Sequence, residues 1–586
     1  MKIDIAFITE TKNLEKVRIA CGQSRVLGAD TETTSLSSYD GRIRTLQLST
    51  AEKCFVMDLD KLGAGNVAAA TSDIILDPHK VKVMQNGKFD IQFMHRHMGL
   101  PLEIPGLFDT MLASQLITAG GEDGKKKVLH GLDSLAERYL GMKVSKKYQK
   151  VRWDGSLFRE QILYAGMDAA VMIPLYRVLS KNLSLNQLDQ VALLEFECVA
   201  ATAHIEQAGM HLDKDLWLKA GEKFAASNLI LGAELKGILG NINFGSWQQV
   251  LVAFEERLGV KLSAVNKTAI EAFIDEYKAE ADMFGSMPLH DVPDVLRKYQ
   301  EYKANLKKES SYGPDFFKFI NKVTGRIHPS FGQNNTDTGR YSVSNPNTQQ
   351  TPGLEDYRRA FTAEAGNVII SSDYSQIELR ILAATAGISS WIKAFDRDED
   401  LHQQTADAVG CTRAGAKVIN FGSAFGMGAA SYSAKTKSSI SSGQAVMKKF
   451  YASVPEFTSW LKSQEEYFQR HNLVRSASGR MRRLDQWGWS KDDLHAAKQA
   501  SRNFPIQATS ADILKTALVK MRRRLPIEAR IVNVVHDEVV TECPIGMATE
   551  VSGIMETCMI EAGQKFVHGV EIKVDTNISK SWNKEK

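Results

Sequence analysis

The sequence predicts a multidomain protein in which an α/β unit precedes a longer α+β region. Its 586 residues exceed what one hydrophobic core usually organises, so at least two domains are expected. The first 115 or so residues alternate short β-like runs with turns, and helical periodicity follows to about residue 185. Helical stretches dominate residues 188–310 and 375–525, and β-like runs return at 368–372 and 531–541.

The composition is that of an ordinary globular protein, with 43% hydrophobic and 24% charged residues. No apolar run approaches the length that spans a bilayer, so membrane insertion is not expected. The start, MKIDIAFITE, lacks the features of a signal peptide. The six cysteines are scattered without paired spacing, which favours reduced thiols in the cytoplasm over disulfides or a zinc site.

The net charge of +4 is too small to indicate a nucleic-acid partner by itself. Basic residues cluster at 143–152, 303–308, 475–483 and 522–524. Such clusters can neutralise backbone phosphates, although most charge runs are only solvated faces.

Acidic residues follow the first strong strand signal. The predicted strands are Val26–Ala29, Arg44–Leu48, Cys54–Met57 and Val81–Met84. Asp30 and Glu32 come directly after the first of them, and residues two apart on a strand share a face. They can therefore reach one ion, or they can be a polar strand end that leads into a turn.

Two further polar pairs lie on predicted helices. Asn86 and Asp90 open the helix after the strand at 81, where Asn86 could cap it and Asp90 could complement its dipole. Tyr164 and Asp168 are four residues apart in a helical run, so they share one helix face.

In this order, DxE, NxxxD and YxxxD resemble the proofreading 3′→5′ exonucleases, over roughly residues 20–185. The resemblance implies that Asp30, Glu32, Asp90 and Asp168 hold two Mg²⁺ ions and that Tyr164 orients the attacking water. Carboxylates suit these ions, because Mg²⁺ prefers hard oxygen ligands. Asp109 also fits the family pattern, but we interpret it as a helix cap.

Two hydrophobic strands of the second half also end in aspartate. The strand at 368–372 runs into Asp373, and residues 532–540 predict a hairpin with Asp537 at its tip. Each aspartate could be a simple turn former. Brought together, the two would form a carboxylate metal site suited to in-line attack at phosphorus.

Between these strands a predicted helix carries Arg413, Lys417, Phe421 and Phe425 at intervals of four. One helix face therefore bears two cations and then two aromatic rings. This pattern describes an amphipathic surface helix with inward aromatics, or a platform on which a nucleotide places its triphosphate and its sugar and base.

The segments DYSQIELR, RxxxKxxxFG and VHDE, in this order, resemble family A DNA polymerases of the bacterial polymerase I type. The stretches around 338–349, 400–406, 503–507 and 209–213 agree. The resemblance implies an RNase H-like exonuclease domain at 1–190 and a right-hand polymerase domain at 191–586. Within the latter it implies a thumb at about 195–335, a palm at about 336–395 and 500–586, and fingers at about 396–499.

The resemblance also implies residue roles. Asp373 and Asp537 would hold two Mg²⁺ ions, which Mn²⁺ could replace, with help from the carbonyl of Tyr374. Glu378 would exclude a ribose 2′-hydroxyl, and Phe421 would stack near the sugar. The remaining nucleotide contacts would be Arg413, Lys417, His402 and Gln376, and Lys417 could also protonate pyrophosphate. The contacts along primer-template DNA would be Arg340, Asn347, Asn503, Gln507 and His536.

Two departures from the family pattern carry consequences. The family usually has tyrosine where this chain has Phe425, so Glu378 is expected to lose a hydrogen-bond partner. With the exonuclease pattern starting near residue 20, we expect no 5′ nuclease domain, as in compact phage replication polymerases. The expected partners are primer-template DNA and deoxynucleoside triphosphates, and the chain is expected to be a monomer. A processivity factor or helicase is a possible further partner that the sequence does not identify.

Three alternatives remain. A single-subunit RNA polymerase would share the paired aspartates and the basic helix, but Glu378 and the exonuclease pattern argue against it. A nuclease with an inactive polymerase-like platform would have to retain Asp373, Lys417 and Asp537 without use. A nucleic-acid-binding protein without chemistry would leave every one of these spacings to coincidence.

Overall fold

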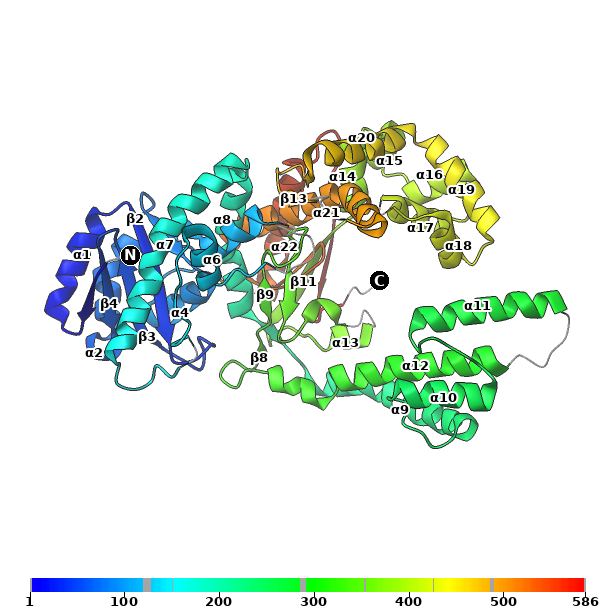
Figure 1. Ribbon diagram of the computed structural model, residues 1–586, viewed down its shortest axis with the longest axis horizontal. Helices are drawn as coiled ribbons and strands as arrows, with labels where there is room; N and C mark the ends of the chain where they lie inside the picture. Colours follow the sequence, from blue (N-terminus) through cyan, green and yellow to red (C-terminus); the bar gives the residue numbers. More distant parts are fainter. Residues whose placement is uncertain are drawn as a thin grey trace.

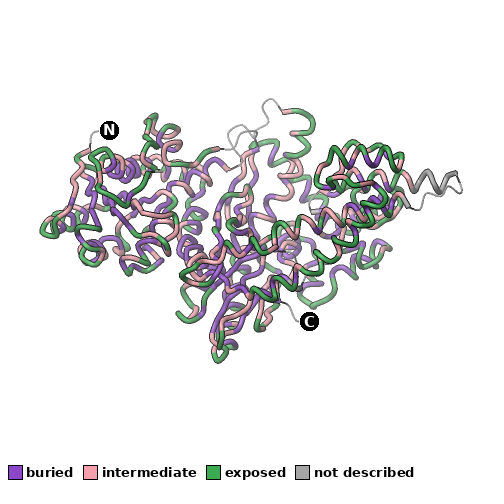
Figure 2. Tube along the Cα trace, turned by 90° about the horizontal axis from the view of Figure 1, so that it is seen from below, coloured by how far each residue is buried: buried purple, intermediate pink, exposed green. Residues whose placement is uncertain are grey.

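The computed structural model describes residues 3–119, 128–149, 151–284, 291–351, 355–424, 426–484 and 489–583. Figure 1 shows an N-terminal unit at one end of the long axis and a sheet near the centre. Two helical groups project from the centre on the other side: α9–α12 below and α14–α20 above. Buried segments are concentrated in the N-terminal unit and the central region (Figure 2).

The N-terminal unit contains a six-stranded sheet in the order β1-β4-β3-β2-β5-β6. Its strands are β1 (Asp4–Ile8), β2 (Val26–Thr33), β3 (Ile43–Ser49), β4 (Lys53–Asp58), β5 (Val81–Met84) and β6 (Leu107–Asp109). The four strands predicted from the sequence are confirmed. β2 continues past the predicted end, so Asp30 and Glu32 lie inside it, paired with Gln47 and Thr45 of β3.

Seven helices surround this sheet in the described part of the chain. They are α1 (Leu14–Gln23), α2 (Leu59–Leu62), α3 (Ala64–Ile75), α4 (Lys88–Met98), α5 (Thr110–Ile117), α6 (Leu132–Leu140) and α7 (Arg159–Leu185). α7 packs across β2, β3 and β4. A Cβ at Gly28 would lie 2.0 Å from the carbonyl oxygen of Ala169, so glycine is what lets β2 approach α7 this closely.

α7 corrects one expectation about the sequence. It is long and apolar enough to cross a membrane by length and composition, which the search for apolar runs missed. In the structure 56% of that apolar window is buried inside the protein. Its hydrophobicity is explained by packing on the sheet.

α8 (Asp189–Ala208) leads out of the N-terminal unit towards the lower helical group. That group contains α9 (Lys214–Leu239), α10 (Trp247–Leu258), α11 (Lys267–Phe284) and α12 (Asp291–Tyr312). It has its own small core, built around Leu235, Phe254 and Tyr299. The short elements β7 (Met210–His211), β8 (Arg326–Ile327), β9 (Ser330–Gly332), β10 (Ser342–Ser344) and α13 (Glu355–Arg359) connect it to the centre.

The central sheet is antiparallel, with the order β14-β15-β11-β16. Its strands are β11 (Asn367–Tyr374), β14 (Arg530–Val535), β15 (Glu538–Pro544) and β16 (Val574–Ser579). Asp373 pairs with Glu538 in the β11–β15 register, so the β14–β15 turn that carries Asp537 lies beside the end of β11. α22 (Ala548–Gln564) packs on this sheet, and α21 (Lys491–Arg524) packs on α22.

The upper group follows β11 directly. Its helices are α14 (Ile377–Ala386), α15 (Ser389–Asp396), α16 (Leu401–Val409), α17 (Arg413–Ala424), α18 (Ala429–Thr436), α19 (Ile440–Ser453) and α20 (Pro455–His471). The hairpin of β12 (Leu473–Arg475) and β13 (Met481–Arg483) then leads into α21.

Candidate active sites

The first candidate site lies where α7 crosses β2. Carboxylate oxygens of Asp30, Glu32 and Asp168 all lie within 4.8 Å of one another. The close approach of β2 and α7 at Gly28 and Ala169 brings Asp168 to this strand. The DxE and YxxxD patterns therefore meet at one point, as expected.

Asp90 reaches the same place from α4. Its Oδ1 accepts hydrogen bonds from the backbone nitrogen of Thr31 (3.0 Å) and from the Thr31 hydroxyl (2.6 Å). Burial raises the pKa of Asp90 to about 7, and the two Thr31 bonds oppose this shift. The pKa of Asp30 is raised by burial first and then by the negative charges of Asp90 and Glu32. The four carboxylates therefore form one electrostatic cluster.

The environment of the Asp168 carboxylate indicates that a cation fits the cluster. Burial raises its pKa to about 7, and a hydrogen bond from Tyr164 opposes the shift. Its Oδ1 is buried without a hydrogen-bond partner in the described part of the chain. A buried oxygen of this kind, facing two further carboxylates, suits a hard divalent cation. Burial, and then the charge of Asp168, raise the pKa of the Tyr164 phenol, which keeps it protonated.

Asp109 is a helix cap, as the sequence predicted. Its carboxylate accepts from the backbone nitrogens of Met111 (2.9 Å) and Leu112 (3.0 Å) at the start of α5. It also accepts from Gly87 (2.7 Å), just before α4. Asn86, by contrast, forms no cap: α4 has Gly87 at that position, and Asn86 adopts a left-handed φ of 55°.

The second candidate site lies at the end of β11. The backbone nitrogen of Tyr374 donates to the carbonyl of Asp537 (3.3 Å), which joins the strand end to the β14–β15 turn. The pKa of Asp537 is raised to about 7, first by burial and then by the negative charges of Asp373 and Glu378. The Tyr374 side chain is buried, and its hydroxyl donates to the carbonyl of Met559 (2.8 Å). The structure therefore brings Asp373 and Asp537 together, as the hairpin prediction required.

A cleft of about 470 Å³ opens at this site. Its lining residues are Arg340, Glu378, Gln507, Ser510, His536 and Asp537. Three of the predicted DNA contacts, Arg340, Gln507 and His536, thus face the same space as Asp537.

Glu378 has a partner that sequence reasoning missed. It forms an ion pair with Arg340 across the cleft. The two residues are 38 positions apart, and no periodicity relates them. The expected loss of a tyrosine hydroxyl as a partner of Glu378 rests on Phe425, which lies outside the described residues, so it stays a prediction; Arg340 is a different partner.

The helix predicted to receive the nucleotide is α17, which packs against α14, α16 and α18. The rings of Phe421 on α17 and His402 on α16 lie 5.7 Å apart. Burial lowers the pKa of His402, and its Nδ1 pairs with the Asn420 amide nitrogen at 3.1 Å.

The two cations of α17 differ. Arg413 is bound to Asp400 (2.6 Å), whereas Lys417 is exposed and has no ion pair within the described ranges. None of Arg413, Lys417, His402 and Phe421 lines the 470 Å³ cleft. These four residues therefore lie with one another on α16 and α17, outside the lining of the cleft at Asp537.

The remaining predicted contacts have local roles. Asn347 accepts from the backbone nitrogen of Gln349 (3.1 Å) and caps a short 3-10 turn. Gln376 has a left-handed φ of 55° at the start of α14. Side-chain oxygens of Gln376 and of Asn503 on α21 are buried without partners in the described chain.

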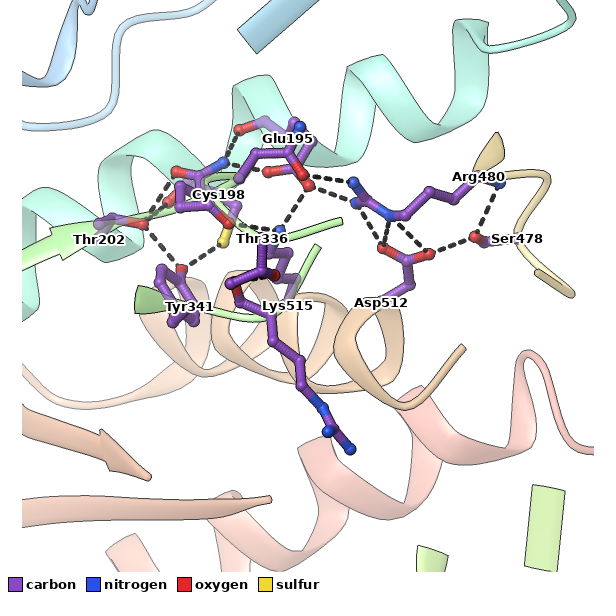
Figure 3. Close-up of polar contacts among 12 residues, drawn as sticks. Glu195, Cys198, Thr202, Thr336, Tyr341, Ser478, Arg480, Asp512 and Lys515 are labelled. Carbon is purple, nitrogen blue, oxygen red and sulfur yellow. Dashed lines mark hydrogen bonds and ion pairs between the residues drawn. The ribbon is translucent and has the colours of Figure 1, made fainter. Parts of the chain in front are cut away.

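Figure 3 shows a buried polar network that the sequence patterns did not reveal. Arg480, from the β12–β13 loop, contacts Asp512 on α21 (2.6 Å) and Glu195 on α8. Lys515 on α21 binds the same Glu195 (2.5 Å). All four side chains are at most 2% exposed, and their two positive and two negative charges balance.

This network also holds the segment that leads to Arg340. Arg480 donates to the side-chain oxygen of Asn334 (2.8 Å), and Lys515 donates to the carbonyl of Gln333 (2.9 Å). A Cβ at Gly339, whose φ is 74°, would lie 2.6 Å from Arg480 Cζ. The backbone beside Arg340 is therefore packed directly on the buried guanidinium.

Comparison with known proteins agrees with the two-site geometry. The profile of DNA polymerase family A matches residues 215–584, and a 3′-5′ exonuclease profile matches residues 5–184. DNA polymerase I of Pseudomonas aeruginosa is 28% identical over 96% of this chain, which spans 64% of that relative's length. DNA polymerase I of Aquifex aeolicus is 27% identical over the full length of both chains. The thermostable DNA polymerase I of Thermus aquaticus is 32% identical over 65% of this chain and 47% of its own.

A solved structure has the same fold. The POL domain of Pol1 from M. smegmatis, in complex with DNA primer-template and dNTP, superposes with a TM-score of 0.84. It covers 98% of this chain and 99% of its own, at 21% identity. The match of residues 215–584 to the family profile takes in more than half of the chain, which therefore belongs to DNA polymerase family A.

Proposed function

We propose that this chain is a template-directed DNA polymerase that extends a primer 3′ end and proofreads it with a 3′→5′ exonuclease. One observation carries the proposal: two separate carboxylate sites, Asp373 with Asp537 and the cluster around Asp168, each within the matching family segment. A binding protein without chemistry has no use for two buried groups of like charge, which destabilise a fold unless a ligand compensates them.

The proposed domains are an exonuclease at 1–190 and a polymerase at 191–586, which the profile matches at 5–184 and 215–584 support. In the polymerase, the thumb would be the α9–α12 group. The palm would be the central sheet with α14, α15, α22 and most of α21, and the fingers would be α16–α20 with the β12–β13 hairpin.

In the polymerase site, Asp373 and Asp537 would hold divalent cations, Mg²⁺ by the hardness of the ligands, together with the Tyr374 carbonyl. When bound, such cations stabilise negative charge that develops at phosphorus. Lys417, exposed and without a carboxylate partner in the described chain, would bind the triphosphate and hold the proton that pyrophosphate takes as it leaves. Glu378 would exclude ribonucleotides at the mouth of the cleft.

In the exonuclease site, Asp30, Glu32, Asp90 and Asp168 would hold the cations that activate water for phosphodiester hydrolysis. The Tyr164 phenol stays protonated, so it would donate to the attacking water and fix its orientation.

Primer-template DNA and deoxynucleoside triphosphates are the proposed partners. The solved structure of similar fold was determined with both. The duplex would run along the cleft lined by Arg340, Gln507 and His536. A monomeric state and a location in the cytoplasm remain predictions, the latter supported by six free cysteine thiols.

Two sets of variants test the proposal by primer extension and by degradation of single strands. Asp373→Asn or Asp537→Asn should abolish extension and leave degradation intact. Asp30→Ala combined with Glu32→Ala should do the reverse. Extension near the wild-type rate in either polymerase-site variant would refute the polymerase assignment, and efficient use of ribonucleotides would favour the RNA polymerase alternative.

A further inference from the structure

A second pocket is lined by residues of the N-terminal unit and of the central region. It has a volume of about 520 Å³, within the usual range for small-molecule sites. α4, α8, the end of α21 and the β8 segment supply its walls. It shares no lining residue with the cleft at Asp537.

The charge of this pocket is one-sided. Four arginines line it, against a single carboxylate, Glu364. Three histidines also line it, but burial lowers the pKa of His204 and of His328, so these two rings add no positive charge at neutral pH. The arginines are Arg96, Arg326, Arg522 and Arg530, and the histidines are His95, His204 and His328. Arg326 is neutralised by Glu364 (2.6 Å) and Glu542 (2.5 Å), and Arg530 reaches Glu364 only at 4.0 Å. No carboxylate is thus left for Arg96 or Arg522 in the described part of the pocket.

Arg522 differs from its two neighbours in sequence. Arg523 forms ion pairs with Glu103 (3.1 Å) and Glu197 (3.0 Å). Arg524 forms an ion pair with Glu561 (2.9 Å). Arg522 is half-buried and lines the pocket, and its Nε is buried without an acceptor among the described residues. A buried N–H without an acceptor is unfavourable, so an anion that enters the pocket and accepts from Arg522 would be bound favourably.

The surrounding groups support a positive potential. Burial, and then the positive charges of Arg522 and Arg530, lower the pKa of His204 to about 4, so its ring is neutral at neutral pH. The Arg96 guanidinium stacks on the Tyr39 ring at 4.1 Å, which leaves the edge of its planar fork available. The rest of the wall is apolar, with Leu102, Leu525 and Ile527 among others.

We propose that this pocket binds a nucleoside phosphate at a site separate from the polymerase centre. Arg522 and Arg96 would hold the phosphate group, because their forked donors match phosphate oxygens. The apolar wall of Leu102, Leu525 and Ile527 would receive the sugar and base, because Arg96 and His328 already pack on the Tyr39 ring. The volume excludes a duplex, but the phosphate can come from a free nucleotide or from the end of a single strand.

Equilibrium dialysis of the full chain with radiolabelled dATP, without primer-template, tests the proposal. The wild type should bind two molecules of dATP. Arg522→Gln should weaken one class of site about tenfold or more, the loss expected for a charge-assisted contact. Lys417→Ala should weaken the other class, and Arg522→Lys should restore part of the first. Arg523→Gln, next in sequence but paired outside the pocket, should bind like the wild type.

A second arm separates the two sources of phosphate. Single-stranded oligonucleotides with and without a 5′-phosphate are titrated into the same variants. If Arg522→Gln weakens only the phosphorylated oligonucleotide, the pocket serves a strand end. Unchanged binding of both dATP and oligonucleotide in Arg522→Gln, with the thermal unfolding midpoint preserved, overturns the proposal.

Discussion

Burial sets the acidity of single carboxylates at both candidate sites. Asp168 is 8% exposed, and its pKa is raised to about 7, whereas an aspartate in the unfolded chain titrates near 3.9. A raised pKa in the folded state means that the ionised form destabilises the fold. Its favourable contribution is complete below about pH 4 and is lost as the pH rises through 7.

Asp168→Asn should therefore stabilise the metal-free protein at pH 8 and have little effect at pH 4 to 5. The expected gain at pH 8 is on the order of 1–2 kcal/mol, because the cluster shares its charge among several groups. Added Mg²⁺ should stabilise the wild type more than the variant, which loses one proposed ligand but keeps the proposed site at Asp373 and Asp537. Thermal unfolding in EDTA and in Mg²⁺ measures both effects, with the exposed Asp73→Asn as control. A variant that is less stable than the wild type at pH 8 in EDTA would contradict the prediction.

Phe421→Tyr should raise the incorporation of dideoxynucleotides strongly, with little change for normal substrates. By family resemblance, a tyrosine hydroxyl at this position fills the place of the missing 3′-hydroxyl. The ring lies 5.7 Å from His402, as expected of a residue in the nucleotide group. Chain-termination assays measure the effect. Phe450→Tyr is not a suitable control, because the Phe450 ring is fully buried and a hydroxyl there would disturb the core. If dideoxynucleotide use stayed unchanged, Phe421 would be a packing residue only.

The spacing of residues in the sequence predicts that two side chains lie together when both belong to the same helix or strand. Asp30 with Glu32 and Tyr164 with Asp168 were found in this way, because strand and helix periods place each pair on one face. Arg340 with Glu378 was not, since only the tertiary fold brings these two together. The Arg480 network was missed for the same reason, as its members come from three distant elements.

At the scale of elements, Asp109 joins the starts of two helices. It caps α5 and binds Gly87 ahead of α4, the helix that carries Asp90. Asp109→Ala should lower the free energy of unfolding by about 1–2 kcal/mol, the usual effect of losing a cap. It should leave measurable exonuclease activity at temperatures where the variant is folded, because we interpret Asp109 as a cap and not as a cation ligand.

Denaturant unfolding and degradation of single strands test these two effects of Asp109→Ala. Asp90→Ala is the matched comparison, since that substitution should abolish degradation. Complete loss of exonuclease activity in folded Asp109→Ala would make Asp109 a metal ligand instead of a cap.

The ends of helices and strands were predicted best in the region where short strands and turns follow one another. The strand at Val81–Met84 matches β5 residue for residue, while β2 runs on through Asp30 and Glu32. Polar residues in the middle of a strand look like its end in a sequence pattern. The pattern does not show that β2 continues to pair with β3 through Asp30 and Glu32. The membrane-length composition of α7 was missed because its apolar residues are interrupted by polar ones, among them Tyr164 and Asp168.

At the scale of the molecule, the Arg480 network connects α8, at the boundary of the two proposed domains, with segments that build the polymerase cleft. α8 leads out of the exonuclease unit, α21 lines the polymerase cleft through Gln507 and Ser510, and the 333–340 segment carries Arg340. Breaking a buried ion pair is costly because the remaining charge stays unpaired. The network therefore holds α21 and the 333–340 segment, which supply residues of the cleft, in a fixed position relative to α8.

Arg480→Lys should weaken primer-template binding about tenfold while leaving the KM for nucleotides and the degradation of short single strands nearly unchanged. Lysine keeps the positive charge but is a point donor, so it cannot bind Glu195, Asp512 and Asn334 at once. The segment packed on the guanidinium at Gly339 would then shift, and Arg340 with it. Arg482→Lys, whose partner Asp337 is exposed at the surface (2.6 Å), is the matched control and should bind DNA normally. DNA titration, steady-state kinetics and thermal unfolding separate the effects. An equal loss in DNA binding, nucleotide use and exonuclease activity would mean that the network only stabilises the fold, with no specific hold on the cleft.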